Sequence, residues 1–353
     1  MRQRIDKIAS STRNVTLRRD ARLGERVTAN AGYVVAGRIH GEKSTYNMLE
    51  DVHGRLVPLH DGDVIAGVLG PRNALQGYAG FVPEAIQPGD VLQVLNTGGV
   101  IGRCTSQNPD VGPPFDIEIL GSVLVFPEFE NRSGVAAQIG MNAISAAREP
   151  LADVPVVYIA GTCMNSGKTL AACRLIRELT KRGKAVGACK LTGVSLRRDA
   201  LQMHDYGART SVSFNDAGIV STTAENAVET ARTLFAHLMR EGAEVIVAEL
   251  GDGILGEYGV QEILADAELK RMSGVFVLCA NDPVGVWGST RVLKEKFEIG
   301  IDVVCGPATD NSVGTRYVSE QLGLTAINAR THGVELGEFV AGRIGETAGK
   351  TTS

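Results

Sequence analysis

Residues 154–169, VPVVYIAGTCMNSGKT, hold the side chains whose types and spacing point most clearly to chemistry. An apolar run from residue 154 to 160 leads into a loop that starts at Gly161 and ends at Gly167-Lys168-Thr169, and a helical pattern follows. A phosphate-binding loop requires this strand–loop–helix order. The loop amides and the helix N-terminus favour an anion at one point. We therefore predict that Lys168 contacts the outer phosphates of a nucleotide and that the Thr169 hydroxyl binds Mg²⁺.

The loop itself supplies the remaining predicted nucleotide contacts. Gly161 and Gly167 enclose five residues, whereas the common motif has four. The alternative is a decayed loop that binds nothing. The predicted contacts are Gly161, Thr162, Asn165, Ser166, Gly167, Lys168, Thr169 and Leu170.

Charged residues at the ends of two later strands narrow the chemistry. Lys190 ends one apolar run, where it could hold an anionic substrate, and Asp199 follows closely, where it could bind Mg²⁺ through oxygen. Glu249 ends another run, which is how a P-loop protein supplies a second metal ligand, with Asp252 as the second choice. We predict Lys168 and Lys190 as catalytic residues and Thr169, Asp199 and Glu249 as metal ligands. The alternatives are a surface lysine, a helix-start aspartate and an ordinary glycine-rich turn.

Strands and helices alternate from about residue 151. Further strands are expected at 185–191, 244–250, 274–280 and 302–305. Thr222-Thr-Ala-Glu225 has the pattern of a capping box that opens a helix. The alternation predicts an α/β fold, with a mostly parallel sheet flanked by helices and ligands at the carboxyl ends of the strands.

The first part of the chain has a different pattern. Short β-type runs broken by turn residues predict a small all-β, barrel-like domain. Gly62-Asp63 and Gly89-Asp90 each open a similar run, which hints at internal pseudo-symmetry. We therefore expect a β-rich domain over 1–125, a linker helix over 126–150, a P-loop NTPase domain over 151–342 and a loose tail over 343–353.

Composition places few further limits on function. A formal net charge of −4 gives no sign of binding to nucleic acid or to an anionic membrane. The six cysteines are scattered and the six histidines form no ligand-spaced cluster, so reduced thiols and no dedicated zinc site are expected. No apolar run is long enough to span a bilayer. These features predict a cytoplasmic protein.

The motifs after strands one, two and three resemble those of dethiobiotin synthetase. The shared order is Gly161-Thr162, then Gly167-Lys168-Thr169, then Lys190, then Asp199-Ala200-Leu201, then Glu249 with trailing glycines. The resemblance covers residues 154–255, and the first 125 residues have no counterpart in it. It implies ATP and Mg²⁺ as cofactors and a homodimer with its substrate site near the interface. It also implies that Lys190 steadies a carboxylate-like acceptor of the γ-phosphoryl group.

This chain departs from that family at the substrate positions. Leu191 replaces a proline, Cys163 replaces an acidic residue, and Leu250 and Asp252 replace glycines. A different acceptor from the biotin precursor is therefore expected. The chain also resembles, over a shorter stretch, a family described as D-glutamate N-acetyltransferase, which has a Thr-Gly after its second strand, as in Thr192-Gly193.

These observations leave several functions open. The first is an ATP- and Mg²⁺-dependent ligase, synthetase or kinase that acts on a small acid, since positioning and charge neutralisation suffice for phosphoryl transfer. The second is a nucleotide-switched regulator or assembly GTPase or ATPase, although the chain lacks an Asn-Lys-x-Asp guanine signature. A third is a binding module in which the β domain acts and the P-loop domain only gates it.

Overall fold

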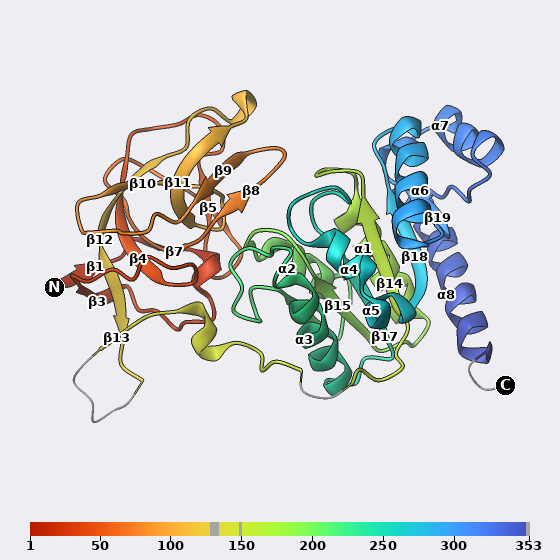
Figure 1. Ribbon diagram of the computed structural model, residues 1–353, viewed down its shortest axis with the longest axis horizontal. Helices are drawn as coiled ribbons and strands as arrows, with labels where there is room; N and C mark the ends of the chain where they lie inside the picture. The colour runs from red at the N-terminus through yellow and green to blue at the C-terminus, as the bar shows by residue number, and fades with distance from the viewer. Residues whose placement is uncertain (128–133, 148–149, 351–353) are drawn as a thin grey trace. The chain divides into compact units, whose positions relative to one another are not determined.

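The computed structural model describes residues 1–127, 134–147 and 150–350, with the backbone alone for residues 346–350 (Figure 1). The chain divides into two compact units that interleave along the sequence. The first unit contains Met1–Ile144, Val194–Arg198 and Phe214–Ser221, and the second contains Ser145–Gly193, Asp199–Ser213 and Thr222–Ser353. Two short segments from the second half of the chain therefore belong to the N-terminal unit.

The regular secondary structure of the first unit consists almost entirely of strands. Short 3₁₀ turns η1 (Ser10–Thr12), η2 (Pro109–Val111) and η3 (Ile139–Asn142) interrupt them. The strands are β1 (Arg2–Arg4), β2 (Lys7–Ile8), β3 (Asp20–Gly24), β4 (Val34–His40), β5 (Met48–Glu50), β6 (Leu56–Pro58), β7 (Val64–Leu69), β8 (Arg72–Asn73), β9 (Tyr78–Phe81), β10 (Val91–Val94), β11 (Val100–Gln107), β12 (Asp116–Val125) and β13 (Val135–Ala136).

Five of these strands close into a ring, which confirms the barrel-like prediction. β12 pairs antiparallel with β4 and with β10. β4 pairs antiparallel with β7, and β7 pairs parallel with β11. The pairing of β11 with β10 completes the ring. Closure removes the exposed edges that an open sheet would present, and fully buried side chains such as Ile39, Ile101 and Ile117 pack in one of its clusters.

The repeated Gly-Asp turns have the same hydrogen bonds. The Gly62 amide donates to the Ile39 carbonyl at 2.9 Å, and the Gly89 amide donates to the Ile119 carbonyl at 2.8 Å. The Asp63 and Asp90 carboxylates each accept from the amide three residues earlier, at 2.7 and 2.8 Å. Both glycines have a positive φ, 82° and 95°, which a residue with a Cβ rarely adopts. The sequence echo is thus a structural repeat that opens β7 and β10.

The linker helix expected over residues 126–150 is absent from the described part of that range. β13 (Val135–Ala136) pairs with the end of β12 instead, and η3 follows it. Gly134 precedes β13 and Gly140 lies within η3, and glycines disfavour a regular helix. Residues 128–133 and 148–149 lie outside the described part of the chain.

The second unit is a parallel sheet with helices on both faces. The strand order is β16-β15-β17-β14-β18-β19, and every pairing is parallel. The strands are β14 (Val156–Gly161), β15 (Val186–Lys190), β16 (Thr210–Ser213), β17 (Val245–Glu249), β18 (Ser273–Cys279) and β19 (Val303–Cys305). The helices are α1 (Lys168–Lys181), α2 (Arg198–Asp205), α3 (Ala227–Arg240), α4 (Val260–Ala265), α5 (Ala267–Arg271), α6 (Pro283–Phe297), α7 (Ser312–Arg316) and α8 (Gly333–Lys350), with a 3₁₀ turn η4 (Pro307–Thr309) and a π-helical turn η5 (Tyr317–Gln321).

The central strand β14 is buried on both faces, and its side chains alternate between the two. Val157 and Ile159 pack in the cluster that includes α1 and α8. Tyr158 points the other way, where its ring lies near Phe235 of α3 and its hydroxyl donates to the Leu269 carbonyl at 2.9 Å. A strand buried on both faces reads as a continuous apolar run, as this one does. The α/β prediction is confirmed.

The tail expected to be loose over residues 343–353 belongs to a helix as far as Lys350. Leu336, Val340 and Ile344 recur every four residues on α8 and are buried in the cluster that includes α1. This spacing puts them on one face of the helix, so packing continues past Gly342. Residues 351–353 lie outside the description.

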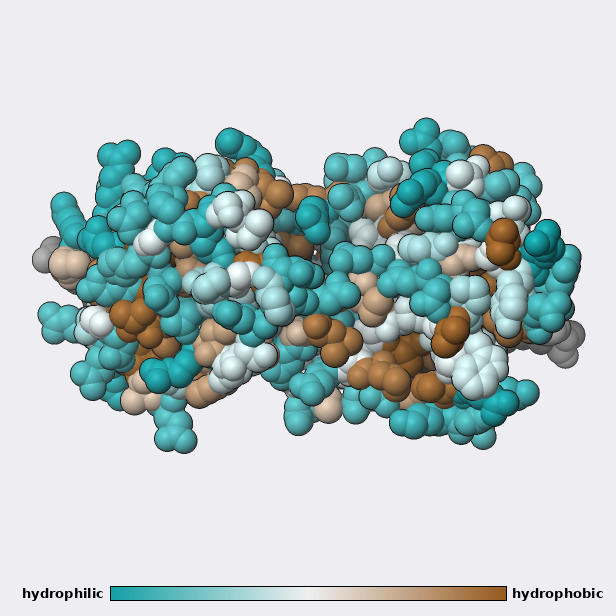
Figure 2. Space-filling view, turned by 90° about the horizontal axis from the view of Figure 1, so that it is seen from above, coloured by the Kyte–Doolittle hydropathy of each residue, from teal (hydrophilic) through white to brown (hydrophobic). Residues whose placement is uncertain are grey.

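Hydrophilic side chains predominate on the face shown in Figure 2, and hydrophobic groups form separate patches. No helix in the described residues combines the length and hydropathy that a membrane span requires.

Replacement of Leu336 tests the packing of α8. We expect Leu336→Ala to lower the free energy of unfolding by about 2–5 kcal/mol, because the substitution leaves a cavity in the core. Val334→Ala is the matched control on the same helix, since Val334 is 56% exposed; it should change stability by less than about 0.5 kcal/mol. Denaturant unfolding measures both variants. Equal stability of the two variants would show that α8 does not pack as described.

Candidate functional site

The loop between β14 and α1 has the backbone of a phosphate-binding loop. Asn165 and Gly167 have φ values of 60° and 92°, and Gly167 is the N-cap of α1. A Cβ at Gly161 would lie 2.3 Å from the Ser166 hydroxyl oxygen, so a larger residue there would force the Ser166 side chain to move. Ser166 is fully buried and Thr162 is partly exposed. The loop therefore turns where the sequence predicts, directly before the helix N-terminus.

Lys168 is the first residue of α1, and its side chain turns back to contact the loop. Its ammonium donates to the Cys163 carbonyl at 2.8 Å and to the Asp252 carbonyl at 2.6 Å. The side chain is almost entirely buried, and burial lowers the pKa of Lys168 against the opposing effect of Glu249. Leu170 follows in the first turn of α1 and is partly buried. Backbone carbonyls of the loop and of Asp252 thus hold the ammonium, and phosphate oxygens of a ligand could replace these carbonyls.

Glu249 and Thr169 meet beside Lys168. The Thr169 hydroxyl donates to Glu249 Oε1 at 3.2 Å. The other oxygen, Oε2, is buried and has no hydrogen-bond partner among the described residues. Burial raises the pKa of Glu249, partly offset by Lys190 and opposed further by Lys168. A buried polar atom normally has a partner, so this oxygen points to a ligand that the protein binds.

The residues around Glu249 fit Mg²⁺. The described residues include no group of three or more histidine, cysteine, aspartate or glutamate side chains that could hold a metal ion. Mg²⁺ does not need such a group, because it keeps several waters and is commonly held by one or two carboxylates together with substrate phosphates. The Thr169 hydroxyl and the Glu249 carboxylate are oxygen donors of that kind.

Lys190 and Asp199 form an ion pair at the neighbouring strand end. Lys190 is in register with Glu249 across β15 and β17, so the two side chains leave the sheet at the same edge. Asp199, the partner of Lys190, is in the first turn of α2 and is largely buried. The second unit thus brings together all five predicted catalytic and metal-binding residues, Lys168, Thr169, Lys190, Asp199 and Glu249.

The sequence does not predict how the loops after β15 and β17 are joined. Thr192 donates from its hydroxyl to the Gly251 carbonyl at 3.0 Å, and a Cβ at Gly251 would lie 2.1 Å from the Thr192 carbonyl oxygen. Thr222 accepts from the Gly193 amide and donates to the Tyr258 carbonyl. The capping box expected at Thr222 is therefore wrong, and α3 begins at Ala227. Local spacing cannot reveal a threonine whose partners are distant in sequence.

Comparisons with known proteins find likeness only among solved structures. No known protein family matches the sequence, and no curated protein does. One match is the signal recognition particle 54 kDa protein of Aeropyrum pernix in complex with GDP, with 19% identity and a TM-score of 0.36 over 57% of this chain and 49% of that one. The chain thus spans about half the length of that protein.

Two further matches have similar scores. The cell division protein FtsY of Thermotoga maritima has 15% identity and a TM-score of 0.34, over 56% of this chain and 70% of that one. The hydrogenase maturation factor HypB of Archaeoglobus fulgidus has 16% identity and a TM-score of 0.32, over 54% and 91%. The second unit combines a parallel sheet with a glycine-bounded loop that leads directly into the N-terminus of α1.

Replacement of Glu249 tests the free-energy cost of burying its charged carboxylate. Because the folded pKa lies above the unfolded one, ionisation of Glu249 opposes folding. Its contribution to stability is therefore present below the unfolded pKa and is lost as the pH rises through the folded pKa. Without Mg²⁺, we expect Glu249→Gln to raise the free energy of unfolding at neutral pH by about 0.5–2 kcal/mol, and the gain should shrink in acid.

Denaturant unfolding across the pH range measures this difference. Glu241→Gln is the control, because Glu241 is exposed at the C-cap of α3. A Glu249→Gln protein that is less stable than the wild type at neutral pH would contradict the prediction.

Proposed function

We propose that this chain binds a nucleoside triphosphate together with Mg²⁺ and hydrolyses it, and that hydrolysis controls a regulatory or assembly step. The observation that carries this proposal is the buried Glu249 oxygen that lacks a partner beside the Thr169 hydroxyl. A carboxylate in this state suits a cation site better than a structural role.

Different residues of the site would bind the phosphates and the metal ion. Lys168 would exchange the Cys163 and Asp252 carbonyls for the outer phosphate oxygens, which offer a charged acceptor. Thr169 and Glu249 would hold the metal, with Asp199 nearby in the same shell. When bound, Mg²⁺ neutralises charge that develops on the phosphates. The loop amides would orient the phosphate chain.

The path of the chain after β15 and β16 supports a switching role. Segment 194–198 begins four residues after Lys190, and segment 214–221 begins directly after β16. Both segments belong to the first unit. A change at Lys190 or Asp199 on nucleotide binding would therefore reach the first unit through only a few residues of backbone. Such coupling is what a nucleotide-switched protein needs.

A second candidate function is transfer of the γ-phosphoryl group to a small carboxylate acceptor, as in a ligase, synthetase or kinase. The position of Lys190 at a strand end supports it, and so does the resemblance to dethiobiotin synthetase, which also implies ATP and a homodimer. The ion pair with Asp199 favours hydrolysis instead, because it already neutralises the Lys190 charge. The shorter resemblance to the D-glutamate N-acetyltransferase family supplies a further alternative acceptor chemistry.

Loss of the Lys168 cation should weaken nucleotide binding. Hydrogen bonds to charged groups contribute about 1.5–3 kcal/mol, so we expect Lys168→Ala to weaken binding by roughly 10–100-fold. Calorimetric titration with ATP and GTP analogues, with and without Mg²⁺, measures the effect. Lys184→Ala is the control, because Lys184 is exposed just after α1. Equal affinity of Lys168→Ala and wild type for both nucleotides would show that the loop does not bind phosphate.

Phosphate release separates the two functions. Hydrolysis without any added acid, left unchanged by a panel of small carboxylic acids, supports the switching role. Release that depends on one acid supports phosphoryl transfer.

A further inference from the structure

We propose that Glu50 of the β-rich unit is a positioning residue for the nucleotide site, because it fixes the backbone directly before Asp199. The inference rests on the proposed function, since Asp199 is a predicted member of the metal shell. Glu50 accepts hydrogen bonds from Ser10, Arg197 and Arg198, which are not among the predicted catalytic or metal-binding residues. It acts through the segment 194–198, which belongs to the same unit as Glu50.

Glu50 is fully buried at the end of β5. Its two carboxylate oxygens accept from the backbone amides of Arg197 at 2.7 Å and Arg198 at 2.8 Å. The Ser10 hydroxyl also donates to it. A buried carboxylate is costly unless it is hydrogen-bonded, and amides at the start of a helix are strong donors to an anion. Three donors therefore hold Glu50 in place, and Glu50 holds the two amides.

Glu50 takes the role that a neighbouring side chain has at most helix N-termini. Helix α2 starts at Arg198, and Arg197, the residue before it, has no acceptor on its side chain. Ser195 is the nearest hydroxyl, but it donates to the Val220 carbonyl at 2.8 Å and accepts from Asn215 at 2.9 Å. The first amides of a helix have no partner within the helix itself. Glu50, 147 residues earlier in the chain, accepts from the Arg197 amide, and it also accepts from the Arg198 amide.

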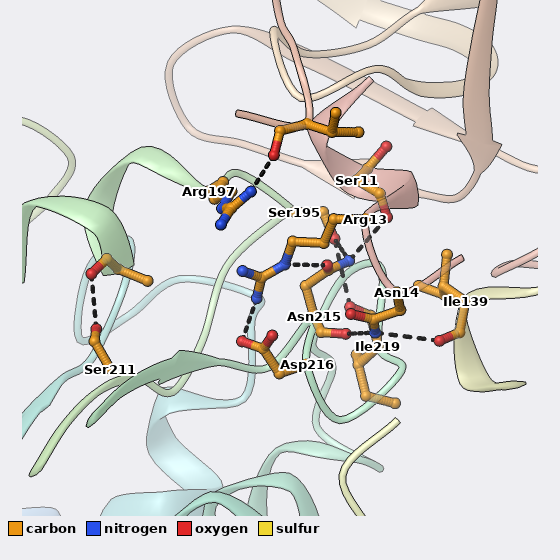
Figure 3. A network of polar contacts seen from close by, with 12 residues as sticks. Ser11, Arg13, Asn14, Ile139, Ser195, Arg197, Ser211, Asn215, Asp216 and Ile219 are labelled. Atoms are coloured by element: carbon orange, nitrogen blue, oxygen red, sulfur yellow. Dashed lines mark hydrogen bonds and ion pairs between the residues drawn. The ribbon is translucent and has the colours of Figure 1, made fainter. Parts of the chain in front are cut away.

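Other contacts hold the same segments, and Figure 3 shows several of them. Arg13 forms an ion pair with Asp216 and donates to Asn215 at 3.2 Å. The Asn215 amide donates to the Ser11 carbonyl at 3.2 Å. Ser10 and Ser11 both belong to the turn η1, so a single turn contacts Glu50 and the segment 214–221.

The consequence falls on Asp199, which follows Arg198 directly. A shift of the first turn of α2 would move the Asp199 carboxylate relative to Lys190, its ion-pair partner. Metal and phosphate sites tolerate displacements of only about 0.5 Å. A distant carboxylate that fixes the backbone beside a metal ligand thus acts as a support for the site.

The test replaces Glu50 by glutamine. The substitution keeps the shape but places a donor where Glu50 accepts, so one of the two amides or Ser10 loses its partner. We expect Mg²⁺-dependent turnover of Glu50→Gln to fall by roughly 10–100-fold, as for other supports of metal ligands. Nucleotide affinity measured without Mg²⁺ should stay unchanged. Glu25→Gln, at an exposed position of the same unit, should behave as wild type.

A double-mutant cycle separates positioning from general destabilisation. If Glu50 acts through Asp199, Glu50→Gln should have no further effect on turnover in an Asp199→Asn background. Additive effects, or wild-type turnover of Glu50→Gln, would overturn the inference. If Glu50→Gln does not fold, Ser10→Ala removes one of the donors and should lower turnover in the same non-additive way.

Hydrogen exchange keeps the test independent of turnover. We expect the amides of Arg197 and Arg198 to exchange faster in Glu50→Gln than in wild type and Glu25→Gln. Unchanged exchange overturns the inference even if the enzyme is active. If exchange is faster in Glu50→Gln but the wild-type protein neither binds nor hydrolyses a nucleotide, the hydrogen bonds of Glu50 are confirmed. The proposed role of Glu50 in a nucleotide site is then refuted.

Discussion

Two cations and two anions lie together at the carboxyl edge of the parallel sheet, three of them buried and Lys190 partly buried, and this constraint shapes the rest of the site. Removing a charge from water costs several kcal/mol unless other charges and dipoles compensate. Lys190 and Asp199 compensate each other directly. Lys168 relies on backbone carbonyls, while Glu249 keeps one oxygen without a partner. The charges of Lys190 and Asp199 therefore compensate each other, whereas those of Lys168 and Glu249 are only partly compensated. We expect phosphate and metal to bind beside Lys168 and Glu249.

The segments 194–198 and 214–221 follow β15, which ends at Lys190, and its neighbour β16, and both segments fold with the β-rich unit. The chain could have closed its loops within the parallel sheet, as most connections in such folds do. Instead, Asn96 donates to the Ser195 carbonyl at 2.8 Å and Asn14 donates to the Asn215 carbonyl at 2.5 Å. Such contacts hold these loops against the β-rich unit. A nucleotide that displaced Asp199 would have to work against these hydrogen bonds.

Features governed by neighbouring residues were predictable from the sequence, and features governed by distant partners were not. The P-loop, α1 and the acid at the end of β17 depend on local spacing and on buried apolar runs, so their patterns are visible. The Gly-Asp turns were visible for the same reason. The linker helix was wrong because the pairing of β13 with β12 decides that stretch. The tail was wrong because the contacts of Ile344 with the core outweigh its glycine-rich neighbours.

Glu50 and Glu249 illustrate why hydrogen bonds, rather than burial, distinguish structural from functional carboxylates. Both side chains are almost inaccessible to solvent, and both end a strand. Both oxygens of Glu50 accept from donors, so a cation would have to displace existing bonds to reach it. Glu249 has a bond to Thr169 on one oxygen and none on the other. An unsatisfied buried oxygen costs about 1–3 kcal/mol, and a bound cation removes that cost. The same residue type thus satisfies backbone amides in one unit and, in the other, keeps an oxygen available for the cation that we propose.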